Sequence, residues 1–97
     1  MDRATMKRLN RVGNARIEAA GTRMMKYTVD FTFADGSDVR SYSAEYIQFS
    51  FTEFAYACKS ITEAIVEDHP YLVREDVYWA VVGARQSARW MPCEDDI

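Results

Sequence analysis

The sequence predicts a small α+β domain. An antiparallel β-meander of two or three strands packs against one long amphipathic helix and a second, C-terminal helix. Two patterns indicate this fold. Side chains alternate between apolar and polar from Met25 to Phe33, and apolar residues recur at helical spacing from Phe51 to Glu67. With 97 residues, of which 48% are apolar, the chain suits a single domain, residues 1–97, with one core.

The N-terminal residues 2–12 have the pattern of a short basic helix that Gly13 can end in the left-handed conformation. A short helix at a chain terminus is marginal without packing, so we expect a mobile basic segment here. From Asn14 to Ala20, apolar and charged residues alternate and favour a strand. The alternative is that the first helix continues through Glu18.

The clearest β signal is a hairpin around Asp35-Gly36, a pair typical of type I′ turns. If these two residues form the loop, the register of both strands is fixed. One face then becomes apolar and the other polar, as expected for a half-buried hairpin. The predicted pairs are Ala34 with Ser37, Phe31 with Arg40, Asp30 with Ser41, Val29 with Tyr42, Thr28 with Ser43 and Tyr27 with Ala44.

The long helix is predicted to start at Ser50, whose hydroxyl can accept a hydrogen bond from the first turn. Glu53 can complete a capping box, and Phe49 with Phe54 can form a hydrophobic staple. One side of this helix is apolar and faces the sheet. The residues predicted on that side are Phe51, Phe54, Ala57, Cys58, Ile61, Ala64 and Ile65.

After Pro70, residues 72–89 fit two structures. The apolar run from Val77 to Val82 is typical of a buried strand. A helix is favoured because acidic residues come early and arginines late, as the helix dipole prefers. Its predicted buried stripe consists of Val73, Val77, Ala80, Val81, Ala84 and Ala88. The opposite stripe is a predicted contact surface for a target or for a homodimer, formed by Glu75, Tyr78, Trp79, Val82 and Gln86. If the segment is buried on both sides, Trp79 is instead a core residue.

The net charge of −3 hides an asymmetry. Residues 1–26 carry seven basic and two acidic side chains, whereas the rest carries five basic and thirteen acidic ones, ending in the acidic tail at 94–96. A solvated surface, a basic patch for nucleic acid, or an acidic surface for a basic groove would each explain this. The basic patch would consist of Arg3, Lys7, Arg8 and Arg11. The acidic surface would consist of Asp30, Asp35, Asp38, Glu53, Glu63 and Glu67.

Catalytic and metal-binding motifs are missing from the sequence. The single histidine, His69, lies in an interhelical turn and is expected to cap or pack. Cys58 is expected in the core and Cys93 as a free thiol, which together do not make a zinc site. We therefore expect a protein that is not an enzyme and has no cofactor or metal. Lacking a signal peptide or a membrane-length apolar run, it is expected in the cytoplasm.

In element order, residues 1–67 would run αβββα, which resembles the double-stranded-RNA-binding domain. In that family, lysines at the start of the second helix bind phosphates. Here the corresponding residues 50–54 include no lysine or arginine, and the first basic side chain of the helix is Lys59. This resemblance therefore implies topology alone.

In size, acidity and lack of catalytic motifs, the chain also resembles small phage-encoded inhibitors of the anti-CRISPR type. Several of these present acidic surfaces that imitate nucleic acid or block its binding groove. This resemblance implies a non-enzymatic protein-interaction module that inhibits a larger protein or ribonucleoprotein complex in the host cytoplasm through an acidic or aromatic surface. The alternative function is a small nucleic-acid-binding domain that uses the basic N-terminal segment.

Overall fold

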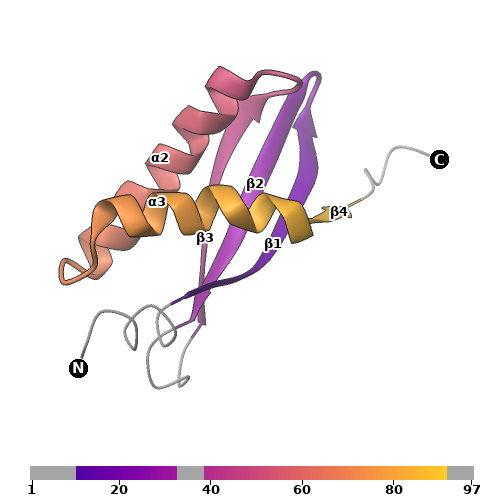
Figure 1. Ribbon diagram of the computed structural model, residues 1–97. Coiled ribbons are helices and arrows are strands. Elements are labelled where there is room, and N and C mark those ends of the chain that lie inside the picture. The colour runs from indigo at the N-terminus through magenta and orange to yellow at the C-terminus, as the bar shows by residue number, and fades with distance from the viewer. Residues whose placement is uncertain (1–10, 33–38, 92–97) are drawn as a thin grey trace.

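The computed structural model describes residues 11–32 and 39–91 and has an α+β fold (Figure 1). A meander of three antiparallel strands is followed by two helices, a 3₁₀ turn and a short fourth strand. The elements are β1 (Arg11–Gly21), β2 (Met24–Thr32), β3 (Val39–Ile47), α2 (Phe51–Asp68), α3 (Arg74–Gly83), η1 (Ala84–Ser87) and β4 (Arg89–Met91). The predicted class, a β-meander with a long helix and a C-terminal helix, is confirmed.

The four strands form one sheet in the order β3-β2-β1-β4. The predicted register between β2 and β3 is confirmed wherever the structure describes it, from Phe31 opposite Arg40 to Tyr27 opposite Ala44. The predicted turn at Asp35-Gly36 and the pair Ala34–Ser37 lie outside the described residues. The guanidinium of Arg40, which lies opposite Phe31, reaches Asp68 at the end of α2, at 3.3 Å.

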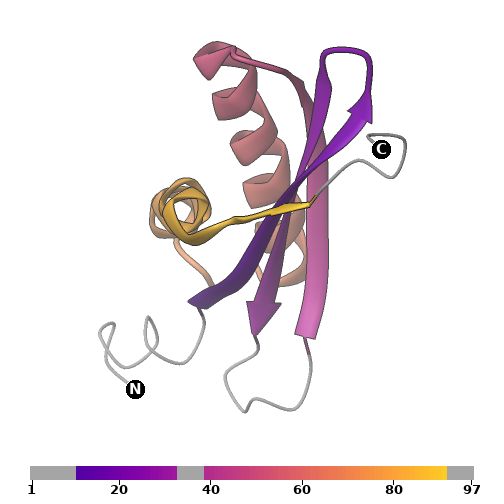
Figure 2. The same ribbon diagram turned by 90° about the vertical axis from the view of Figure 1, so that its right-hand side faces the viewer.

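Both helices lie on the same side of the sheet, where α2 covers β3, and α3 with η1 covers β1 (Figures 1 and 2). The core lies between these two layers. The Tyr27 hydroxyl donates a buried hydrogen bond of 2.7 Å to the Val81 carbonyl, which joins β2 to α3. The largest fully buried side chains are Tyr27, Phe31, Ile17, Ile61, Ile65, Val29 and Val81.

The strand prediction for residues 14–20 is confirmed, and β1 begins earlier than expected, at Arg11. The predicted helix 2–12 is therefore wrong at Arg11 and Val12, which pair with β2, and Gly13 lies inside the strand. Residues 2–10 lie outside the described residues. The last strand, β4, was not predicted. It pairs in parallel with β1, a segment far away in sequence, and its three residues are too few to show alternation.

Residues 74–83 form the predicted helix, so the strand alternative is wrong. Only part of its predicted stripe is buried. Val77 and Val81 face the core, whereas Val73 and Ala80 are exposed. Val73 precedes the helix, and the helix tightens into η1 after Gly83, so a single helical period does not hold over the whole segment.

Candidate functional site: an aromatic cleft at the start of α2

The start of α2 carries two phenylalanine side chains that face solvent. Phe49 is 93% exposed and Phe51 is 81% exposed, whereas Phe54, on the same turn as Phe51, is only 5% exposed. The Ser50 cap forms as predicted, because its hydroxyl accepts from the Glu53 N–H at 3.2 Å. The predicted staple between Phe49 and Phe54 is wrong, and so is the burial of Phe51. In a capping box the Glu53 side chain would accept from the Ser50 N–H. Here the Ser50 N–H donates to the Ile47 carbonyl instead, at 3.3 Å, and closes a turn.

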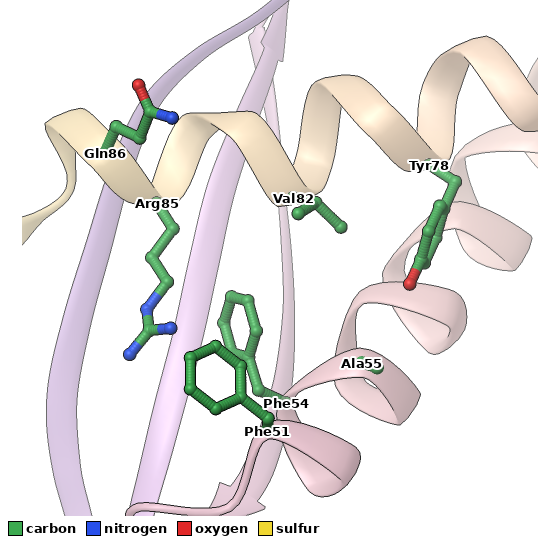
Figure 3. A pocket seen from close by; sticks show the side chains of 7 residues that line it. All are labelled: Phe51, Phe54, Ala55, Tyr78, Val82, Arg85 and Gln86. Atoms are coloured by element: carbon green, nitrogen blue, oxygen red, sulfur yellow. The ribbon is translucent and has the colours of Figure 1, made fainter.

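An open cleft of about 450 Å³ lies between the first half of α2 and the segment that runs from Tyr78 of α3 through η1. Figure 3 shows Phe51, Tyr78 and Arg85 around it, with Val82 pointing into it and Gln86 turned away. We call this site the aromatic cleft. The residues that line it are Phe51, Phe54, Ala55, Tyr78, Val82, Arg85 and Gln86.

A second hollow of about 280 Å³ adjoins the aromatic cleft on the side of the turn between β3 and α2. The two hollows share Phe51, Phe54 and Arg85. The second one is bordered by Phe49, and by Met25 and Tyr46 of the sheet. Together they make one apolar surface that extends from the turn before α2 to α3.

Arg85 is the charged residue at the centre of this surface. Its guanidinium lies 4.6 Å from the centre of the Phe54 ring and 5.5 Å from that of Phe51, within the range of cation–π attraction. Neither hollow is lined by an acidic residue. Within the part of the chain that the structure describes, Arg85 makes no ion pair. Burial raises the pKa of the neighbouring Tyr46 hydroxyl, and the positive charge of Arg85 partly opposes this.

The backbone at Phe49 adopts the left-handed conformation, with φ at 66°. The hydrogen bond from the Ser50 N–H to the Ile47 carbonyl closes a four-residue turn, in which Phe49 is the third residue. A positive φ at that position, after a residue with negative φ, is typical of a type II turn, where glycine or asparagine is preferred. A bulky residue is strained here. Phe49 therefore combines backbone strain with an apolar side chain in water, and neither favours the fold.

Three of the five contact residues predicted on the C-terminal helix line the aromatic cleft: Tyr78 and Val82 of α3, and Gln86 of η1. Trp79 is 61% exposed, so the alternative that it is a core residue is wrong. Its ring contacts that of Tyr78, with 5.2 Å between the centres, and continues the aromatic surface along α3. Glu75 instead borders a different hollow between the helices, beside Lys59 and Arg74.

The predicted acidic residues that the structure describes do not gather at one place. Asp30 lies on the sheet face opposite the helices. The glutamates lie along α2, at Glu53, Glu63 and Glu67. Asp30 accepts from Arg16 at 3.1 Å and from Ser41 at 2.7 Å, and Glu63 pairs with Arg74 at 2.7 Å. Burial alone would raise the pKa of Asp30, but these hydrogen bonds lower it below its ordinary value. Asp35 and Asp38 lie outside the described residues.

The other predicted site residues fall in different places. Arg3, Lys7, Arg8 and Cys93 lie outside the described residues, and Arg11 begins β1 opposite Thr32. Cys58 is fully buried, as predicted. His69 is the C-terminal cap of α2 and stacks on Phe31, with 5.4 Å between the ring centres.

Phe49, Phe51 and Arg85 were not predicted as site residues. Phe49 was assigned to a staple and Phe51 to the buried stripe, because local spacing does not reveal which positions the sheet can cover. The available signal was the density of aromatic residues, since three phenylalanines fall within residues 49–54.

No family model, curated protein or solved structure matches this chain. Among the described residues, no three histidine, cysteine, aspartate or glutamate side chains lie close enough together to hold a metal ion. None of the helices within residues 11–32 and 39–91 has the length and apolar character needed to cross a membrane.

Proposed function

We propose that this protein is a non-enzymatic interaction module that binds a partner protein through the aromatic cleft. The supporting observation is the outward position of Phe49 and Phe51 beside a hollow that contains Arg85. Exposed aromatic side chains next to an arginine are typical of the energetic centre of protein interfaces. A contiguous apolar surface of this kind is also unfavourable in water unless a partner covers it.

The lining of the cleft indicates the chemistry of the partner. An apolar side chain can enter between Phe51, Tyr78 and Val82, where the walls are carbon-rich. A carboxylate beside that side chain can pair with Arg85, which has no acidic neighbour in the cleft. Such a pair gains strength when the surrounding apolar groups exclude water. The proposed partner therefore presents an apolar anchor next to an acidic residue.

Within this proposal the protein is an inhibitor that binds a larger nucleic-acid-handling complex, as small phage-encoded inhibitors of the anti-CRISPR type do. Its small size and net charge of −3 support this class. The aromatic surface takes the main part in binding. The acidic residues contribute less to binding, because Asp30 and Glu63 are already paired with arginines.

The proposal is tested by capture from a nuclease-treated host lysate, followed by measurement of the affinity for each captured protein. Phe51→Ser and Arg85→Gln should each weaken binding of the true partner by at least ~30-fold, or ~2 kcal/mol. The matched control is Tyr56→Ser, which removes another exposed aromatic residue of α2 that does not line the cleft. Equal binding by all three variants and the wild type would refute the aromatic cleft as the binding site.

A second experiment tests the alternative function, a nucleic-acid-binding domain. In that case, purified wild-type protein should bind duplex or single-stranded probes with an affinity that falls steeply as salt rises. Arg8→Ala and Arg11→Ala should then each reduce the salt slope by about one unit. Capture of protein partners from an untreated lysate that is lost after nuclease treatment would also support the alternative.

A further inference from the structure

Among the described residues, β3 forms a long edge of the sheet. In the order β3-β2-β1-β4, strand β3 has β2 on one side and no other strand of the described residues on its other side. All nine residues of β3 pair with β2 in continuous register, from Val39 to Ile47. The opposite edge is β1, which the three-residue β4 covers only from Arg16 to Glu18. Strand β3 therefore offers a long row of backbone donors and acceptors for another strand.

The usual features that protect an edge strand are largely missing from β3. Edge strands are commonly shielded by lysine, proline, a β-bulge or a charge that points inward. β3 contains no lysine or proline, and its register with β2 has no break. Arg40, its one basic residue, is already bound to Asp68 of α2. Val39 and Ile47, at the two ends of the strand, are 54% and 46% exposed.

We propose that β3 pairs antiparallel with β3 of a second copy of this chain, so that one sheet continues across both copies. Full overlap of the two strands places Ser43, the middle residue, on the two-fold axis. In this register the core-facing residues of both copies lie on the same side of the joined sheet, together with the helices. The interface is isologous, as in most homodimers.

The sequence of β3 is self-complementary in that register. Val39 lies opposite Ile47 of the second copy at each end of the interface, which pairs the two exposed apolar residues twice. Tyr42 lies opposite Ala44, and Glu45 lies opposite Ser41, so no like charges face each other. A shift by two residues in one direction would place Val39 opposite Glu45. A shift in the other direction would place Ile47 opposite Ser41. Full overlap is thus the register that the side chains favour.

The first test is a disulfide on the proposed two-fold axis, made by Ser43→Cys in a Cys93→Ser background. Directly opposed residues in antiparallel strands have Cα atoms ~4.5–5.5 Å apart, within disulfide range. Ser41→Cys in the same background is the control, since its own copy would lie four residues away, ~13 Å along the strand. Mild oxidation should give a covalent dimer for Ser43→Cys alone. Equal cross-linking of both variants, or none, would overturn the proposed register.

The second test uses charge and needs no cross-link. Val39→Lys with Ile47→Lys places like charges opposite each other twice, and should raise the dimer dissociation constant at least tenfold in sedimentation or light scattering. Val39→Lys with Ile47→Glu places opposite charges in the same positions and should restore the dimer. Both positions are exposed, so the monomer should fold in each variant. A wild type that stays monomeric at all concentrations, or equal dimerisation of all variants, would contradict the proposal.

This inference does not depend on the aromatic cleft. Phe51→Ser, which should abolish partner binding, should leave the β3 dimer unchanged. Conversely, the pair Val39→Lys and Ile47→Lys should still bind the partner with one copy. A monomer whose β3 edge is instead occupied by a strand of another protein would overturn the assignment to a second copy.

Discussion

The two ends of α2 use aromatic side chains in opposite ways. At its C-terminal end, His69 stacks on Phe31 of the sheet, and Asp68 accepts hydrogen bonds from Tyr42 at 2.7 Å and from Arg40 at 3.3 Å. These contacts all join the helix to the sheet. At its N-terminal end, Phe49 and Phe51 turn toward solvent and contribute little to the core. The comparison indicates that the aromatic contacts at the C-terminal end support the fold, whereas the N-terminal end supports it through Phe54 and also presents Phe49 and Phe51 to solvent.

The largest expected effect separates two phenylalanines on the same turn of α2. Phe54→Ala should lower the free energy of unfolding by ~3–5 kcal/mol, because it removes a ring packed against Tyr27 and Tyr46. Phe51→Ala should change it by less than ~0.5 kcal/mol, because that ring is already in water. Denaturant titration of both variants measures the difference. A large loss for Phe51→Ala would mean that this residue belongs to the core.

A smaller effect of opposite sign is expected at the turn before α2. Phe49→Gly should raise the free energy of unfolding by about 1 kcal/mol, because glycine adopts a positive φ without strain. Arg23→Gly is the matched control, since Arg23 has a φ of 61° in the turn between β1 and β2. Both variants should melt at higher temperature, but only Phe49→Gly should weaken partner binding. Destabilisation by Phe49→Gly alone would show that its side chain supports the fold.

The smallest effect concerns acid at the C-terminal end of α2. The hydrogen bond from Tyr42 is the main cause that lowers the pKa of Asp68 below its ordinary value of 3.8. A carboxylate with a lowered pKa stabilises the fold above its unfolded pKa, and this contribution is lost as pH falls through the folded pKa. Asp68→Asn should therefore be less stable than wild type at neutral pH, and the gap should shrink below pH 3.8. Thermal melts across this range test the expectation, and a gap that stays constant with pH would contradict it.

Local pattern was enough to predict the sheet register and the start of α2. Alternation in β2 fixed which residues face the core, and the cap at Ser50 follows from side-chain chemistry within one turn. Features that depend on distant segments could not be predicted in this way. The pairing of β4 with β1 joins the two ends of the described chain, and no local signal marks it.

The aromatic cleft was predicted in part for the same reason. Helical spacing placed Tyr78 and Val82 on a common outer stripe, and both line the cleft. The spacing could not show that η1, which continues α3, brings Arg85 over the rings of Phe51 and Phe54, because that depends on how the two helices cross. Exposure of Phe51 likewise depends on where the sheet ends beneath α2.

The buried thiol of Cys58 can report how often α2 separates from the sheet. Burial raises the pKa of this thiol to about 12, so in the folded state it is neutral and shielded from reagents at ordinary pH. Alkylation of Cys58 therefore requires α2 to separate from the sheet. In a Cys93→Ser background, the labelling rate divided by that of an unstructured thiol would give the opening equilibrium directly, without denaturant. The same label would show by how much a bound partner holds the helix closed.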